Sequence, residues 1–199
     1  MLLPLICCII KFKTFNASLR VLFIYICFSV LADLLGFLFM QNKVQTHIIY
    51  NSFTVIECSF LVMIYYLNFE EKRMRNFLKI FYVIFILLAI HILIIKGKFS
   101  WQENFLSSYE AIFLMFLSIA YFHKLLLELN IPKLNEYYFF WINTGILIYF
   151  STGFILFLFK GYIEQRGIKT YNLLYSLHWL SYMVYNIILS LGIWKMKRI

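Results

Sequence analysis

The sequence has few charged residues and very few prolines and glycines, and each shortage excludes a class of protein. Only 14% of the 199 residues are charged, whereas a soluble domain usually has about 25%. With 2 prolines and 7 glycines, the chain lacks the composition of disordered or collagen-like segments. Hydrophobic residues make up 63% and aromatic residues 21%, more than the core of a soluble domain of this length can bury. Since the net charge is +9, the composition predicts a small integral membrane protein with a basic bias.

The sequence motifs of common enzymes and metal sites are also absent. No H-E-x-x-H, G-x-S-x-G or P-loop pattern occurs, and the cysteines form no C-x-x-C pair. All four cysteines lie in apolar segments, where thiols behave as small hydrophobic groups. We therefore predict no disulfide framework, no catalytic residue, no metal site and no cofactor, and we do not expect an enzyme.

Six apolar windows are long enough to cross a membrane as helices, which takes about 20 residues each. They cover residues 19–40, 48–67, 77–95, 105–127, 138–159 and 171–194. Residues 1–10 form a seventh apolar run that is about half as long as a span. We interpret it as a short first helix, because it lacks the basic start and small-residue cleavage site of a signal peptide. The fold prediction is an all-α integral membrane helical bundle, with six full spans and one short N-terminal helix in a single domain over residues 1–199.

The basic residues are distributed unevenly between the two ends of this predicted bundle. One end has twelve: Lys11, Lys13, Arg20, Lys72, Arg73, Arg75, Lys79, Lys124, Lys133, Lys195, Lys197 and Arg198. The other end has six: Lys43, Lys96, Lys98, Lys160, Arg166 and Lys169. Because basic loops stay in the cytoplasm, we predict a bacterial inner-membrane protein with a cytoplasmic C-terminus. The N-terminus lies outside if residues 1–10 span the membrane and inside if they do not.

The densest cluster of charge follows the span at 48–67 and includes Lys72, Arg73 and Arg75. Membrane topology and attraction to anionic lipid account for such a cluster. The alternative is a docking site for an acidic protein partner or for nucleic acid. Glu70 and Glu71 directly precede the three basic residues, and this mixture of signs makes direct nucleic-acid binding the weaker alternative.

Titratable side chains within the apolar windows are costly in lipid and usually have a partner or a function. The predicted topology gathers five of them toward the outer half of the bundle: Asp33, Glu57, His91, Glu110 and His178. Three interpretations remain open. These groups form hydrogen bonds that join helices, they line an outward-facing pocket for a small ligand, or they relay protons or ions.

The last window contains a regular polar stripe. Tyr171, Tyr175, His178, Tyr182 and Tyr185 are separated by alternating steps of four and three residues. This spacing places them on one face of a helix. The stripe predicts a seam between two helices, and the alternative is an aromatic wall of a ligand pocket. In the window at 138–159, Gly145 and Thr152 also share a face, which favours close approach of a neighbouring helix.

Residues 140–151 (Phe-Trp-Ile-Asn-Thr-Gly-Ile-Leu-Ile-Tyr-Phe-Ser), with Tyr50, Asn51, Ser52 and Glu57, resemble a poorly characterised bacterial family of small multi-pass membrane proteins. In size and lack of soluble domains, the chain is also similar to the membrane accessory proteins of type VI-B CRISPR loci. The second resemblance implies a regulator of an RNA-targeting effector in antiviral defence, with no nuclease activity of its own.

The leading functional prediction is a non-enzymatic membrane accessory or regulatory protein. It would reside in the lipid bilayer and act through a protein partner on the cytoplasmic side. The alternative is a small-ligand sensor or carrier that uses the outer polar cluster, and an ion or proton pathway is a third interpretation. The sequence leaves the oligomeric state open.

Overall fold

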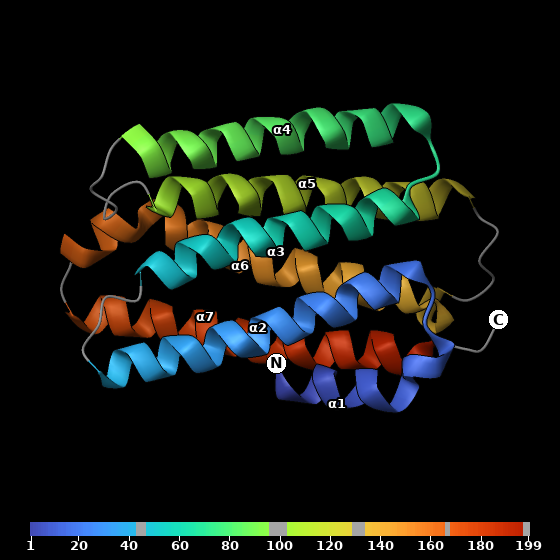
Figure 1. Cartoon of the computed structure of the whole chain (residues 1–199), viewed down its shortest axis with the longest axis horizontal. Helices are drawn as coiled ribbons and strands as arrows, with labels where there is room; N and C mark the ends of the chain where they lie inside the picture. Colours follow the sequence, from blue (N-terminus) through green and yellow to red (C-terminus); the bar gives the residue numbers. More distant parts are fainter. Residues whose placement is uncertain (43–46, 96–102, 129–133, 166–167, 197–199) are drawn as a thin grey trace.

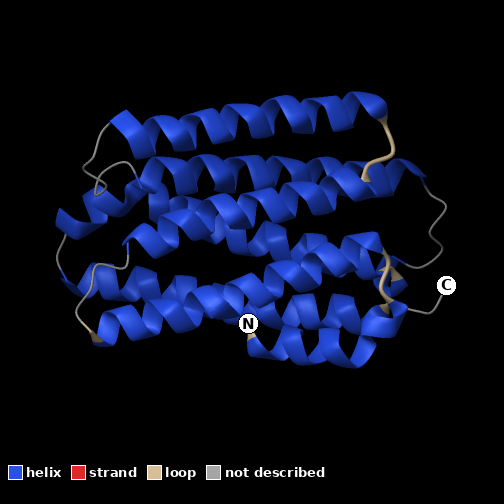
Figure 2. Ribbon diagram, viewed as in Figure 1, coloured by secondary structure: helices blue, strands red, loops and turns tan. Residues whose placement is uncertain are grey.

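The computed structural model describes residues 1–42, 47–95, 103–128, 134–165 and 168–196. Its elements are α1 Leu2–Lys11, η1 Phe12–Thr14, α2 Ala17–Gln41, α3 His47–Asn68, α4 Lys72–Ile95, α5 Glu103–Glu128, η2 Leu134–Glu136, α6 Tyr138–Gln165 and α7 Ile168–Lys195. No strand occurs in these ranges (Figure 2), which confirms the all-α prediction.

The six long helices coincide with the six apolar windows, but several extend beyond them. α4 begins at Lys72, ahead of the window that opens at residue 77, and α6 continues to Gln165. Hydropathy marks only the apolar part of a helix, whereas the backbone hydrogen bonds continue into polar residues. The start of α2 has a local cause, since the side chain of Asn16 accepts a hydrogen bond from the backbone N–H of Leu19 at 2.9 Å.

Five of the described helices contain a stretch long and apolar enough to cross a membrane. These stretches are Ala17–Gln41, Lys72–Ile92, Leu106–Leu127, Tyr138–Leu158 and Asn172–Lys195. In α3 the corresponding stretch is the shorter Ser52–Asn68. The helices are therefore compatible with a multi-pass membrane protein, while the sixth full span remains a prediction.

The long helices lie side by side, with α4 at one edge of the bundle and α1 at the opposite edge (Figure 1). The turns α1–α2 and α3–α4 and the C-terminus lie at the same end. We call this the basic end. Its described basic residues are Lys11, Lys13, Arg20, Lys72, Arg73, Arg75, Lys79, Lys124 and Lys195. The structure thus places at one end most of the residues that the sequence assigned to the cytoplasmic side.

The first helix is short, as the sequence predicted. α1 has 10 residues and packs against α7 and α2. The N-terminus lies midway along the bundle (Figure 1), and the Met1 ammonium is 3.8 Å from the Asp33 carboxylate. α1 therefore covers only the half of the bundle next to the basic end.

Close helix packing in the interior depends on small residues and on aromatic rings. α7 packs most extensively against α6. A Cβ atom added at Gly192 would lie 2.9 Å from Ile142 Cγ1 and 3.0 Å from the Tyr138 carbonyl oxygen. Between α4 and α5, the rings of Phe81 and Phe113 stack with centroids 4.1 Å apart. Such contacts supply the van der Waals attraction that holds helices together where water is absent.

The outer surface of the bundle is strongly apolar. Ile80 and Leu87 on α4 are 63% and 60% exposed, and Leu127 on α5 is 67% exposed. α2 likewise exposes Leu31, Leu34 and Phe37. Soluble monomers rarely expose contiguous apolar areas beyond a few hundred Å², so a surface of this kind is typical of helices that face lipid.

Candidate polar site inside the bundle

A buried hydrogen-bonded chain links α7, α2 and α3. Tyr185 Oη donates to Tyr25 Oη at 3.4 Å, and Tyr25 Oη donates to Glu57 Oε1 at 2.6 Å. Both tyrosines are fully buried and Glu57 is 8% exposed. Tyr25 lies on the buried face of α2, one turn after Leu22 and one turn before Ser29. Helix periodicity therefore places the phenol opposite the only carboxyl group of α3.

Asp33 lies one turn beyond Ser29 on α2 and contacts α7, the helix that carries Tyr185. Tyr182 Oη donates to Asp33 Oδ2 at 3.0 Å, and the Met1 ammonium approaches the same oxygen. The Asp33 side chain is 53% exposed, so it lies at the margin of the bundle. It remains close enough to Glu57 for the two carboxyl groups to interact electrostatically.

Glu110 on α5 is the most deeply buried of the predicted carboxyl groups, at 3% exposure. It interacts electrostatically with Glu57 across the α3–α5 contact. Its Oε1 atom has no hydrogen-bond partner within the part of the chain that the structure describes. Two carboxylates in a low-dielectric interior repel each other, so a cation bound near Glu57 and Glu110 would lower the energy of the pair.

His178 on α7 packs its imidazole ring against aromatic rings of α6. Its imidazole lies 5.3 Å from the Tyr149 ring and 5.6 Å from the Phe157 ring, measured between centroids. Gly153 lies next to this ring, and a Cβ there would be in ordinary van der Waals contact with His178 Cε1 at 3.6 Å. Among the described residues, the buried His178 Nδ1 has no hydrogen-bond partner. His91, the fifth predicted group, is exposed on α4 and takes no part in these hydrogen bonds.

The tyrosine stripe of α7 forms a seam with α6 and α2. The Tyr185 and Tyr149 rings stack at 5.0 Å, and Gly145 makes room, since a Cβ there would lie 3.1 Å from Tyr185 Cδ2. Tyr175 is half-buried, and the side chain of Tyr171 lies outside the described residues. Thr152 is exposed and donates to backbone carbonyls of its own helix. The prediction of close approach is therefore confirmed at Gly145 and wrong at Thr152.

A second buried polar joint, which the sequence did not single out, connects α3, α5 and α6. Tyr65 Oη donates to Asn143 Oδ1 at 2.6 Å and lies 2.7 Å from Ser118 Oγ. Asn143 Nδ2 donates to the Ser118 carbonyl at 3.0 Å, and all three side chains are fully buried. The only sequence signal was an Asn in an apolar window, and its partners lie on two other helices.

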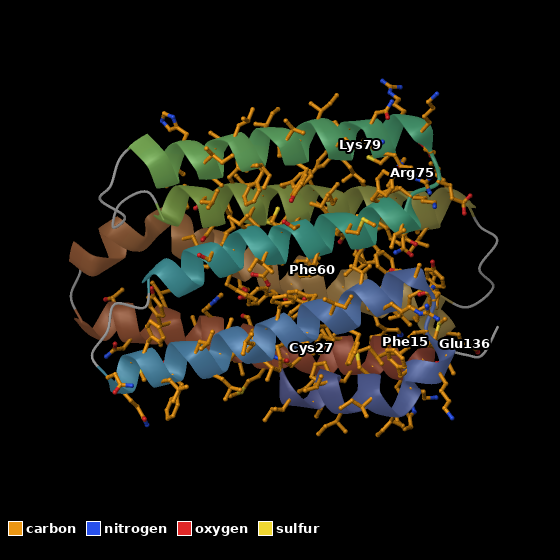
Figure 3. All side chains as sticks on the ribbon, in the orientation of Figure 1. Phe15, Cys27, Phe60, Arg75, Lys79 and Glu136 are labelled. Atoms are coloured by element: carbon orange, nitrogen blue, oxygen red, sulfur yellow. The ribbon has the colours of Figure 1, made fainter. Side chains whose placement is uncertain are left out.

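The residues predicted for docking lie at the start of α4. Lys72 and Arg73 are exposed. Arg75 is half-buried, donates from Nε to the Phe69 carbonyl at 2.6 Å, and lies over the Tyr66 ring at 5.1 Å. Figure 3 shows Arg75 and Lys79 together at this end, and the Lys79 ammonium lies 5.4 Å from the same ring. Arg75 therefore holds the α3–α4 turn, which leaves Lys72 and Arg73 as the accessible pair.

Within the described ranges, no group of three His, Cys, Asp or Glu side chains is placed to hold a metal ion. The described cysteines are free. The site is therefore a set of carboxyl and phenol groups that are hydrogen-bonded between α2, α3 and α7, with the Glu110 carboxyl of α5 close enough to interact with it electrostatically.

Comparisons with protein-family models, curated proteins and solved structures found no match. The two resemblances drawn from the sequence consequently remain predictions.

Proposed function

We propose that the chain is an integral protein of the bacterial inner membrane with its basic end in the cytoplasm. Five sufficiently apolar helices and the exposed Leu, Ile and Phe side chains support the membrane location. α3 is 22 residues long, which gives about 33 Å of helix at 1.5 Å per residue. It is the sixth span of this proposal. The collection of basic residues at one end supports the orientation.

Membrane fractionation with reporter fusions tests this placement. We expect the protein to stay in the membrane fraction after a carbonate wash. We also expect green fluorescent protein fused to the C-terminus to fluoresce, and alkaline phosphatase fused to the C-terminus to be inactive. An active phosphatase at the C-terminus would reverse the orientation, and protein in the soluble fraction would overturn the membrane location.

We further propose that the protein is a non-enzymatic accessory or regulatory subunit that binds an acidic partner through Lys72 and Arg73. One observation carries this proposal. The first turn of α4 contains Lys72, Arg73 and Arg75 and no acidic residue. Basic groups at a helix N-terminus oppose the helix dipole, at about 0.3–1 kcal/mol each. Arg75 has a structural role, but Lys72 and Arg73 have no such role in the described contacts. Membrane topology accounts for basic residues at this end, and attraction to an acidic partner would also account for this exposed pair at the start of a helix.

Chemical crosslinking in the native host tests the docking site. The tagged protein is compared with Lys72→Glu/Arg73→Glu and with Arg20→Glu, an exposed charge reversal at the same end but on α2. We expect a partner that is captured by the wild type and by Arg20→Glu and lost with the double variant. Equal capture by all three proteins, or substrate turnover by the purified chain alone, would contradict the proposal.

Glu110 Oε1 and His178 Nδ1, which have no hydrogen-bond partner among the described residues, favour a second candidate function, a sensor or carrier for a small cationic ligand. Purified protein would be unfolded thermally in sodium, potassium and N-methylglucamine chloride at equal ionic strength. This candidate predicts a cation-dependent shift in Tm that persists in His91→Ala and is lost in Glu110→Gln and Glu57→Gln. A Tm that is the same in all three salts would exclude it.

A further inference from the structure

A cleft at the basic end lies outside the polar site described above. It forms where α1 and α7 end side by side and η1 begins (Figure 1). Its volume is about 800 Å³, and its lining residues are Ile10, Lys11, Lys13, Thr14, Trp194, Lys195 and Met196. Three of these seven side chains are lysines and none is acidic.

The charge of this cleft exceeds what the two helix ends require. A helix C-terminus carries roughly half a negative charge, so the ends of α1 and α7 together offset about one of the three lysine charges. Thr14 Oγ1 also donates to the Lys11 carbonyl at 2.7 Å, which satisfies one free carbonyl at the end of α1. About two positive charges therefore remain for an external anion.

The cleft continues into an apolar surface along both helices. Leu3, Ile6 and Ile10 are spaced by three and four residues and form one exposed stripe of α1. Leu191 and Trp194 form a matching exposed stripe on α7. The Lys11 ammonium lies 4.9 Å from the centre of the Trp194 ring, which brings a charge and an amphipathic aromatic group together. Trp side chains of this kind gather at the boundary between lipid headgroups and acyl chains.

We propose that this cleft binds an anionic phospholipid, with the phosphate of the headgroup between Lys11, Lys13 and Lys195 and the acyl chains along the exposed stripes of α1 and α7. Basic recesses between helices at the cytoplasmic surface suit such headgroups. A soluble phosphate compound would use the lysines but not the adjoining stripes, so the apolar surface selects the lipid. The inference rests on the membrane location proposed above.

Native mass spectrometry of the purified protein in detergent micelles tests the site. Phosphatidylglycerol and phosphatidylcholine are added at equal concentrations to the wild type and to Lys11→Gln/Lys13→Gln/Lys195→Gln. The matched control is Arg20→Gln/Lys72→Gln/Arg73→Gln, which removes the same charge at the same end. We expect the wild type and the control to prefer phosphatidylglycerol, and the cleft variant to lose about tenfold or more of that affinity. Thermal unfolding checks that all three proteins are folded.

Three outcomes would overturn the proposal. The first is that the wild type binds the two lipids equally. The second is that the cleft variant and the control lose phosphatidylglycerol binding to the same extent. The third is that added inorganic phosphate displaces the lipid completely. The last outcome would indicate a site for free phosphate. Because lipid binding is measured in micelles and location by fractionation, a membrane-bound protein without lipid preference would contradict this inference alone.

Discussion

Tyr25 and Glu57 form a short hydrogen bond between α2 and α3 in the buried interior. We expect Tyr25→Phe to lower stability, because Glu57 then loses its described hydrogen-bond donor. Bonds of this type inside membrane proteins contribute about 0.6 kcal/mol on average and up to about 1.7 kcal/mol. A double-mutant cycle with Glu57→Leu, which removes the accepting oxygen, measured by denaturant unfolding in mixed micelles, should give a coupling energy in that range. Strictly additive effects would contradict the described bond.

Among the buried polar residues, we expect substitution of Asn143 to lower the stability of the bundle most. Replacement of Asn143 by Ala removes the hydrogen bonds to the Tyr65 hydroxyl and to the Ser118 carbonyl, while the Tyr65 hydroxyl keeps Ser118 Oγ at 2.7 Å. Each lost hydrogen bond costs about 0.5–1.5 kcal/mol, so we expect a clear loss of Tm. Asn186→Ala is the matched control, because Asn186 has a buried Oδ1 that lacks a partner among the described atoms. An Asn186 variant as unstable as the Asn143 variant would argue against this ranking.

At the scale of the helical element, Gly192 sets the distance between α6 and α7. Ala has a higher helix propensity than Gly by about 1 kcal/mol, yet a Cβ at this position meets the backbone oxygen of Tyr138, which cannot rotate away. Overpacking costs about 1–3 kcal/mol. We therefore expect Gly192→Ala to destabilise the protein. Gly153→Ala should be neutral or stabilising, since the nearest atom there belongs to the movable Phe157 ring. Thermal unfolding of both variants checks the contrast.

Charge reversal at the start of α4 should weaken partner binding without lowering the stability of the protein. Lys72→Glu and Arg73→Glu each replace an unfavourable charge near the helix N-terminus with a favourable one, about 0.3–1 kcal/mol, which repulsion from the preceding Glu70 and Glu71 partly offsets. We expect the double variant to have an unchanged or higher Tm in micelles while it loses the partner. A lower Tm would mean that these side chains stabilise the fold, as Arg75 does.

Sequence patterns identified the helices well and the contacts between them poorly. Long apolar windows are sufficient to locate helices, because the length of a span and its backbone hydrogen bonds are local properties. α2 is apolar on all sides, so nothing in its sequence shows that Tyr25 faces Glu57. The rotation of each helix is set by partners such as Tyr185, which lies 160 residues away. For the same reason His91, which looked equivalent to Glu110 by depth, is exposed on α4.

At the scale of the whole molecule, the apolar surface predicts a contrast in cysteine labelling. Cys27 on α2 is exposed in the described structure (Figure 3), but lipid should cover it in the membrane. Two variants are compared, each with a single cysteine: one has only Cys27, and the other has only the cysteine introduced by Arg73→Cys. In membrane vesicles made permeable, so that the reagent reaches both faces, a polar maleimide should label the Arg73→Cys variant and should not label the variant with Cys27 alone. Both should react after denaturation. Labelling of Cys27 in intact membranes would mean that water, rather than lipid, covers this face of α2.

The hydrogen bond between Tyr182 and Asp33 joins residues 149 positions apart, and this separation has a consequence for biogenesis. During translation, α2 leaves the ribosome long before α7. The hydrogen bond between Tyr182 and Asp33 can therefore form only after α7 is inserted. A chain that stops after α6 would keep the Met1 ammonium beside the Asp33 carboxylate but would lack the Tyr182 donor, and a carboxylate with fewer partners is costly in a membrane. We therefore expect a chain truncated after α6 to accumulate to a lower level in the membrane than the full sequence, which immunoblotting of membrane fractions would measure.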